Sequence, residues 1–200
     1  MNSEQPKRIA FILFDGFELL DVFGPAEIFA KVPGLELEFS SVDGNNVASS
    51  QGVEVVPDTA FSTLTCDTVV VPGGEGTRAL VKDSAFLTQI NSIASSASLI
   101  CSVCTGSAIL AAAGLLEEYS ATSNKRAFDW ASSFGRNVEW KRSARWVHDR
   151  DRWTSSGVAA GTDMAIAFVS HYFGAPLAEK IAHDLEIQAH RDADHDPFAV

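Results

Sequence analysis

Short apolar runs along the chain alternate with longer stretches in which apolar residues recur at helical spacing. Residues 9–14 and 68–71 are dominated by aliphatic and aromatic side chains, as are residues 98–103, whereas residues 35–42 alternate with polar side chains. A continuous apolar run is typical of a strand buried on both faces. These four segments are predicted strands, the one at 35–42 being less buried.

Helical spacing predicts six helices between and after these strands, over residues 25–31, 84–96, 106–113, 125–134, 161–173 and 176–190. Pro25 suits the first position of the helix at 25–31, and Gly114 is expected to end the helix at 106–113. The pattern of residues 144–155, with two short apolar segments on either side of a polar turn, predicts a hairpin. Strands that alternate with helices indicate an α/β fold with a mostly parallel sheet covered on both faces.

The charge balance and length narrow the class of protein. The 200 residues contain no linker or repeat, which predicts one domain over residues 1–200. A net charge of −11 disfavours binding to nucleic acid or to anionic membrane surfaces. No apolar stretch approaches the roughly 18 residues of a membrane span. Three cysteines are too few for a disulfide framework, and we expect a cytoplasmic protein with no signal peptide.

In a parallel sheet, reactive groups collect at the carboxyl ends of the strands. Cys104 follows the strand at 98–103 and precedes a helix opened by small residues, the arrangement of a nucleophile elbow. The positive end of that helix is expected to lower the pKa of the Cys104 thiol. Alternatively, Cys104 is a buried cysteine with a purely structural role. Cys101 lies inside the strand and is interpreted as core, and Cys66 carries no motif.

Two other strand ends carry candidate chemistry. Asp21 lies in an otherwise apolar segment, where burial would raise the pKa of its carboxyl and let it act as a general acid. It could instead be a plain helix cap. After residues 68–71, Gly73 and Gly74 expose backbone N–H groups that could form an oxyanion hole with the N–H of Thr105. A phosphate loop is disfavoured because no Gly-Lys-Ser/Thr ending follows.

We expect neither a cofactor nor a metal. His183, Glu186 and His190 fall on one predicted helix, but the two histidines are seven residues apart, about 10 Å along the axis. A solvated face is the simpler interpretation. The polar tail at Asp192, Asp194, His195 and Asp196 is expected to be exposed as well.

An ordered set of motifs over most of the chain resembles the ThiJ/PfpI superfamily, and its isonitrile hydratase branch most of all. They are Asp21-Val22-Phe23-Gly24-Pro25, Pro72-Gly73-Gly74, Val103-Cys104-Thr105-Gly106, Ala111-Ala112-Ala113-Gly114 and Thr154-Ser155-Ser156-Gly157 with Ala160-Gly161-Thr162-Asp163. The resemblance implies a flavodoxin-like three-layer α/β/α sandwich that forms a homodimer. It also implies Cys104 as nucleophile, Asp21 as acid, and Gly74 and Thr105 as oxyanion donors.

The sequence departs from many relatives at Asn124, where they have a histidine, and Asn cannot act as a general base. The leading hypothesis is therefore a cysteine-dependent enzyme that hydrates a small isonitrile through Cys104 and Asp21. One alternative is glyoxalase-like or deglycase-like action on α-oxoaldehydes, against which Asn124 counts. A second is a redox-sensing or chaperone-like stress protein in which Cys104 is oxidised.

Overall fold

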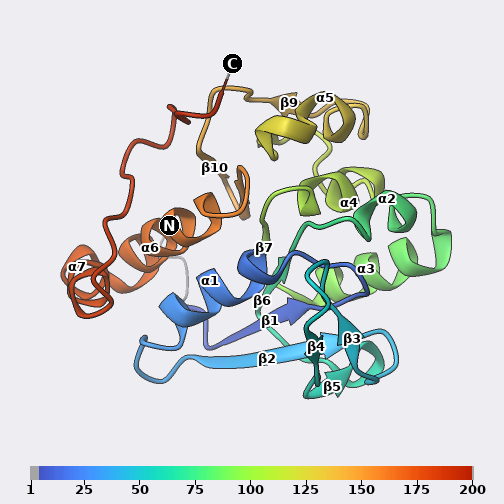
Figure 1. Ribbon diagram of the computed structural model, residues 1–200, viewed down its shortest axis with the longest axis horizontal. Helices are drawn as coiled ribbons and strands as arrows, with labels where there is room; N and C mark the ends of the chain where they lie inside the picture. The colour runs from blue at the N-terminus through green and yellow to red at the C-terminus, as the bar shows by residue number, and fades with distance from the viewer. Residues whose placement is uncertain (1–4, 200) are drawn as a thin grey trace.

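Seven strands form the main sheet of the computed structural model, which describes residues 5–199 (Figure 1). The strand order is β10-β11-β7-β6-β1-β2-β5, and all neighbours run parallel except the hairpin β10–β11. The strands are β1 (Arg8–Ile12), β2 (Glu36–Ser41), β5 (Thr59–Ala60), β6 (Thr68–Val71), β7 (Leu99–Ser102), β10 (Trp146–Asp149) and β11 (Arg152–Ser155). The predicted mostly parallel sheet and the hairpin are thus confirmed.

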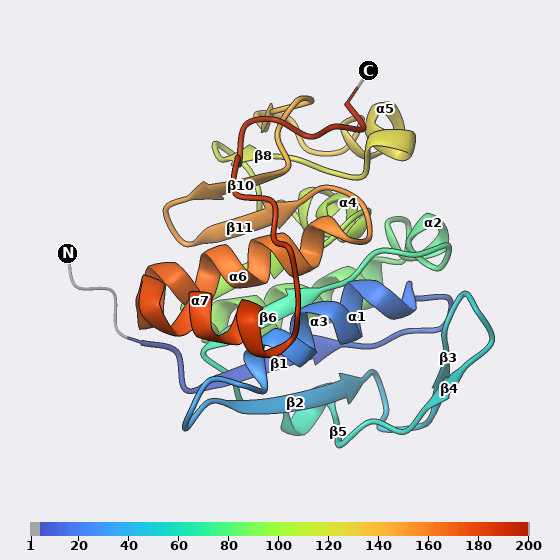
Figure 2. The same cartoon turned by 60° about the vertical axis from the view of Figure 1, so that its left-hand side comes forward.

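Helices cover both faces of this sheet, which gives the expected three-layer sandwich. One layer contains α1 (Leu19–Phe29), α6 (Ala160–Phe173) and α7 (Ala175–Asp184), and the other contains α2 (Thr77–Leu80), α3 (Ser84–Ser96) and α4 (Gly106–Ala112) (Figures 1 and 2). Smaller elements decorate the edges: β3 (Val47–Ala48) with β4 (Glu54–Val55), β8 (Ser120–Ala121) with β9 (Glu139–Trp140), the 3-10 turns η1 (Phe61–Thr63) and η2 (Lys125–Ala127), and α5 (Phe128–Ala131).

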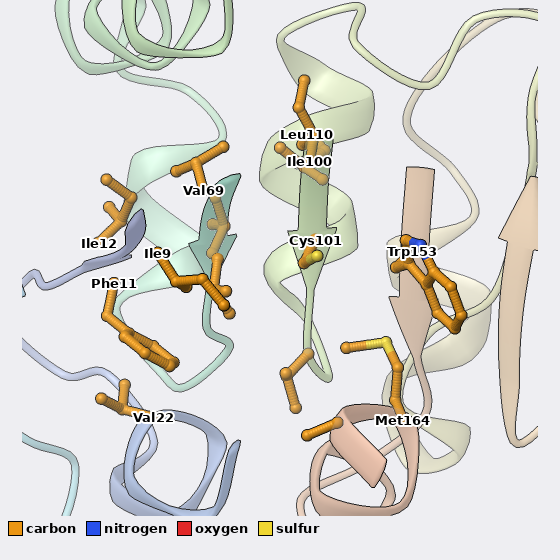
Figure 3. Close-up of a cluster of buried hydrophobic side chains, with 14 of the residues drawn as sticks. Ile9, Phe11, Ile12, Val22, Val69, Ile100, Cys101, Leu110, Trp153 and Met164 are labelled. Carbon is orange, nitrogen blue, oxygen red and sulfur yellow. The ribbon is translucent and has the colours of Figure 1, made fainter. Parts of the chain in front are cut away.

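The core lies on both faces of the central strands, as their continuous apolar sequences require. In Figure 3, Phe11 of β1 points toward Val22 of α1, while Ile100 of β7 lies near Leu110 of α4. Cys101 is part of this cluster and is 1% exposed, which confirms its interpretation as a core residue. The central strands are therefore fixed from both sides, and their carboxyl ends form a rigid platform.

The first helix begins six residues earlier than predicted, at Leu19, and Pro25 lies inside it. Tertiary packing outweighs the local preference of proline for a first turn. Gly24 allows close approach to α6, since an added Cβ would lie 2.7 Å from the Thr162 hydroxyl, and Gly161 of α6 lies against the Pro25 ring. The earlier start of α1 places Asp21 in the first turn of the helix, with its side chain buried.

The prediction of a uniformly exposed tail is wrong at Asp196. This carboxylate is 1% exposed and lies 3.5 Å from the Arg145 guanidinium, which also pairs with Asp163 at 2.7 Å. The Arg145 guanidinium is buried, and a buried charge without a partner is costly. Asp196 is therefore buried with it as one of its two carboxylate partners. The last helix also ends at Asp184 rather than at residue 190.

Candidate active site

The carboxyl ends of β1, β6 and β7 meet at one edge of the sheet, as their neighbouring positions require. The turn after β6 is joined to the segment after β1 by the Glu18 N–H, which donates to the Gly73 carbonyl at 2.8 Å. It is joined to the turn after β7 by the Gly74 N–H, which donates to the Thr105 hydroxyl at 3.1 Å. The three turns that the sequence pointed to therefore form one site.

Cys104 occupies the strained turn between β7 and α4. Its φ of +58° lies in a region that few non-glycine residues adopt, and such strain is common at reactive positions. The Cys104 N–H donates to the Ser156 carbonyl at 2.9 Å, and its own carbonyl accepts from the Ser107 and Ser123 hydroxyls. Gly106 admits no side chain, because an added Cβ would lie 2.1 Å from a carbonyl oxygen of β6. The structure thus has the predicted strand-turn-helix elbow.

The Asp21 carboxyl is fully buried beside this elbow. Its Oδ2 accepts the Gly73 N–H at 2.9 Å, and its Oδ1 has no oxygen or nitrogen partner among residues 5–199. Its side-chain neighbour is the Cys104 thiol. Burial raises the pKa of Asp21 to about 8, and the nearby Glu18 charge adds to the rise. At neutral pH the carboxyl therefore keeps its proton, as a general acid must.

The Cys104 thiol differs from the expectation of a lowered pKa. Burial, followed by the negative charge that Asp21 can carry, raises the pKa of Cys104 to about 12. Three donors oppose the rise: the N–H groups of Thr105 and Val158 and the side chain of Asn124. Desolvation outweighs these donors, so the resting site holds a thiol and a carboxylic acid with no net charge. The three donors remain in place to receive negative charge on sulfur.

Asn124, the departure from many relatives, is fixed in two directions. Its Oδ1 accepts the Ala127 N–H at 3.1 Å and so caps η2. Its Nδ2 lies against Gly157, where an added Cβ would be only 2.4 Å away. This leaves the amide facing the Cys104 sulfur as a donor. The residue thus supplies a hydrogen bond to the Cys104 thiol, and it cannot act as the base that a histidine could be.

The three N–H groups expected to bind an oxyanion are all engaged in this resting site. The Gly73 N–H donates to Asp21 and so supports the acid. The Gly74 N–H donates to the Thr105 hydroxyl, which also lies 3.1 Å from the Thr77 hydroxyl, and the Thr105 N–H is directed at the Cys104 sulfur. The geometry therefore favours charge on sulfur and a proton on Asp21 over a preformed site for a substrate oxygen.

These groups open onto a cleft of about 370 Å³, large enough for a small substrate. The lining residues are Glu18, Gly74, Glu75, Arg78, Cys104, Thr105, Asn124, Arg126, Ala127 and Val158. The Val158 N–H, a donor to the thiol, was not anticipated from sequence. The small-residue run Ser155-Ser156-Gly157 after a buried strand was its only signal, since such runs often mark close backbone approach.

Neither a metal centre nor a membrane span is found in the part of the chain that the structure describes. Residues 5–199 contain no group of three or more His, Cys, Asp or Glu side chains placed to hold a metal ion. His183 is on α7 and exposed, whereas Glu186 and His190 lie beyond the end of that helix. No helix among these residues is both long and apolar enough to cross a membrane.

The raised thiol pKa predicts how alkylation depends on pH. Labelling of Cys104 by iodoacetamide should accelerate steadily from about pH 7 to about pH 10, because only the growing thiolate fraction reacts. Peptide mapping after timed exposure measures the rate, and Cys101 should stay unlabelled until the protein unfolds. A rate that levels off below about pH 8.5, the reference range of cysteine, would contradict this picture of the resting site.

The fold and site define a class, and comparison with known proteins agrees with it: the chain belongs to the DJ-1/PfpI family, which it matches over residues 7–171. Among curated proteins, it is 33% identical to the isonitrile hydratase of Pseudomonas putida over 180 residues, covering 90% of this chain and 78% of that protein. The family assignment made from the ordered motifs is therefore confirmed.

Other relatives differ in the role that their names give them. The chain is 29% identical to the HTH-type transcriptional regulator GbdR of Pseudomonas aeruginosa over 192 residues, 90% of this chain but 51% of the regulator. A ThiJ/PfpI family protein from Pseudomonas syringae superposes with a TM-score of 0.84 at 31% identity, covering 94% of this chain and 77% of that one. The family thus contains both an enzyme and a regulator among these relatives.

Proposed function

We propose that this protein is a cysteine-dependent isonitrile hydratase that converts isonitriles into N-substituted formamides. The observation that carries the proposal is the pairing of a buried, protonated Asp21 carboxyl with a thiol on an elbow turn. An isonitrile carbon needs a nucleophile and a proton at the same atom, and this pair supplies both. The 33% identity to the Pseudomonas putida isonitrile hydratase supports the same reaction.

The first step adds the thiol across the terminal carbon of the isonitrile. Cys104 sulfur forms the new bond to that carbon, and Asp21 delivers its proton to the same carbon. The thiol proton passes to the carboxylate, so Asp21 ends the step protonated again. The product is a thioimidate, R–N=CH–S–Cys104, with the mass of protein plus isonitrile. Donors from Thr105, Val158 and Asn124 stabilise the sulfur while its negative charge develops.

The second step hydrolyses this thioimidate. Water adds to the carbon while Asp21 gives a proton to nitrogen and accepts one from the water. The tetrahedral adduct then expels the Cys104 sulfur, which regains a proton through Asp21, and releases R–NH–CHO. The sum of the steps is one isonitrile plus one water to one formamide. The Gly74 N–H would bind the oxygen of the adduct only after leaving the Thr105 hydroxyl, and the Thr105 N–H only after leaving the Cys104 sulfur.

Both competing functions fit the site less well. Attack on an α-oxoaldehyde builds negative charge on oxygen and needs a base, yet the N–H donors are engaged and Asn124 cannot accept a proton. A peroxide sensor needs an accessible thiolate, whereas burial keeps Cys104 protonated. All three cysteines are free, so a reducing, cytoplasmic setting suits the thiol chemistry.

The pH dependence of turnover tests the assignment of Asp21. Because the acid form is the active one and its pKa is about 8, kcat/KM for an aryl isonitrile should be highest below about pH 8. Above that value it should fall about tenfold per pH unit as the carboxyl loses its proton. Isonitrile consumption followed spectroscopically measures the profile. A kcat/KM that rises as the pH increases above about 8 would contradict the role of Asp21 as a general acid.

The proposal includes a homodimer, for which an exposed apolar patch gives support. Leu20 and Phe23 of α1 and Val53 beside β4 are each more than a third exposed. Gln51 binds both the Glu18 carboxylate and the Leu19 N–H, which brings the β3–β4 turn against the start of α1. Large apolar side chains that are exposed in one chain are candidates for burial in an interface.

Light scattering at micromolar concentration should give twice the chain mass. Phe23→Glu should shift the mass toward one chain, because a charge in an apolar interface is costly to bury. Phe198→Glu is the matched control, since Phe198 is exposed in the tail and outside the patch. A single-chain mass for the unmodified protein contradicts the homodimer.

A further inference from the structure

Two arginines line the cleft that holds Cys104 and pair with no carboxylate in the described residues. Arg78 comes from α2 and Arg126 from η2. Six of the nine arginines form ion pairs within residues 5–199, but these two form neither an ion pair nor a side-chain hydrogen bond there. Their N–H donors are therefore available to a ligand in the cleft.

The two arginines reach the same cleft from different elements, and one of them is held in place by an aromatic ring. The Arg78 guanidinium stacks on the Trp130 ring of α5, 3.5 Å from the ring centroid, and this contact fixes its plane. Trp130 belongs to α5, which directly follows the turn η2 that carries Arg126. An anion bound in this cleft would be attracted by both positive charges.

The acidic residues of the cleft belong to its other wall. Glu18 is held by Gln51, whose Nε2 donates to both carboxylate oxygens at 2.8 and 2.9 Å. Glu75 follows the glycine turn, and its N–H donates to the Ser50 hydroxyl at 3.3 Å. Both therefore adjoin the β3–β4 segment, whereas Arg78 faces α5. The Glu18 carboxylate is therefore held on the hairpin side of the cleft, whereas the Arg78 guanidinium is held on the α5 side.

We infer that the substrate carries a carboxylate at the end remote from its reacting carbon, and that Arg78 and Arg126 bind it. This inference rests on the proposed isonitrile hydration. An isonitrile must enter carbon first to reach Cys104 and Asp21, so its substituent extends to the mouth where the arginines lie. A guanidinium presents parallel N–H donors that match a carboxylate, and stacking on Trp130 reduces the entropy lost on binding. The substrate class is thus an isocyano carboxylate.

A matched pair of substrates tests the charge preference. Para-isocyanobenzoate and para-isocyanobenzamide share the ring and the isonitrile and differ in charge. The benzoate should have a kcat/KM about tenfold higher at low salt, the size expected of a charge-assisted contact, and the advantage should shrink as salt is added. In Arg78→Gln and Arg126→Gln the ratio of the two values should fall toward one. Arg136→Gln, an exposed arginine outside the cleft, should leave the ratio as it is.

A second pair of reagents separates this inference from the reaction itself. Para-iodoacetamidobenzoate and para-iodoacetamidobenzamide alkylate a thiol without any isonitrile chemistry. If the protein hydrates neither isonitrile, the proposed function fails, and the alkylation rates of Cys104 still report the charge preference. The anionic reagent should be several-fold faster with the unmodified protein and lose that advantage in both arginine variants.

Equal rates for the two reagents with the unmodified protein would overturn the inference. So would an advantage of the benzoate that survives both Arg78→Gln and Arg126→Gln, or one that Arg136→Gln removes equally, since a general surface charge would then explain it. Circular dichroism of the variants confirms that each retains its fold before rates are compared.

Discussion

Replacing Cys104 with alanine is expected to abolish isonitrile turnover altogether. In the proposed reaction the Cys104 sulfur is the atom that bonds to substrate, and no other thiol lines the cleft in the described residues. Alanine keeps the Cβ at the strained turn, so the backbone bonds to Ser156 and from the Ser107 and Ser123 hydroxyls can persist. The measurement is formamide production by mass spectrometry, with intact-protein mass as a second readout.

The unmodified protein should accumulate an adduct equal to the mass of one isonitrile when hydrolysis is slow, and Cys104→Ala should accumulate none. Cys101→Ala is the matched control. It removes a thiol from the core and should cost stability, since a buried cavity is left, while turnover continues. Formamide production by Cys104→Ala, or an adduct that maps to Cys101 or Cys66, would rule out Cys104 as the nucleophile.

The layout of the site could be predicted from sequence because parallel sheets obey strong rules. Three apolar runs marked the inner strands, and their carboxyl ends had to meet. The sequence alone therefore predicts that Cys104 and Asp21 lie near each other. Hydrophobic periodicity also gave the bounds of α3 and β6 to the residue. These features depend on local pattern and on topology, both of which the sequence carries directly.

The features that were predicted wrongly depend on contacts between distant segments. The start of α1 followed from packing of Gly24 and Pro25 on α6, which outweighs the local preference of proline. The buried Asp196 follows from its pairing with Arg145, about fifty residues away. The Thr105 N–H, expected from sequence to bind an oxyanion, faces the thiol and lowers its pKa, in the direction expected of a helix start. The depth of burial, which the sequence does not show, reverses the net direction of the pKa shift.

Replacing Asp21 with asparagine should lower isonitrile turnover by about 10²–10⁴-fold, the usual contribution of a general acid–base group. Asparagine has the same shape as the protonated carboxyl. Its amide oxygen can still accept the Gly73 N–H, and its NH₂ group can still face Cys104, but it cannot transfer a proton. Because geometry is kept, the loss reports proton transfer alone. The double variant with Cys104→Ala should be little worse than Cys104→Ala, since the two groups act in one step.

Stability gives an independent readout of the same variant. The folded pKa of Asp21, about 8, lies above its unfolded value, so its contribution to stability is complete at low pH and is lost as pH rises toward and through about 8. The asparagine side chain of the variant does not titrate. The unmodified protein should therefore lose stability relative to Asp21→Asn as the pH rises from about 4 to about 8. The difference in free energy of unfolding between the two proteins should shift in favour of Asp21→Asn over this range. Denaturant unfolding at several pH values measures the difference.

Glu27→Gln is the matched control for both readouts, because Glu27 is an exposed carboxylate on the same helix and outside the cleft. It should change turnover little and should not alter the pH dependence of stability in this way. Turnover by Asp21→Asn within about threefold of the unmodified protein is too small a loss for a general acid. That result would falsify the proposed mechanism, and a pH-stability curve unchanged from the unmodified protein would show that Asp21 is not protonated in the fold.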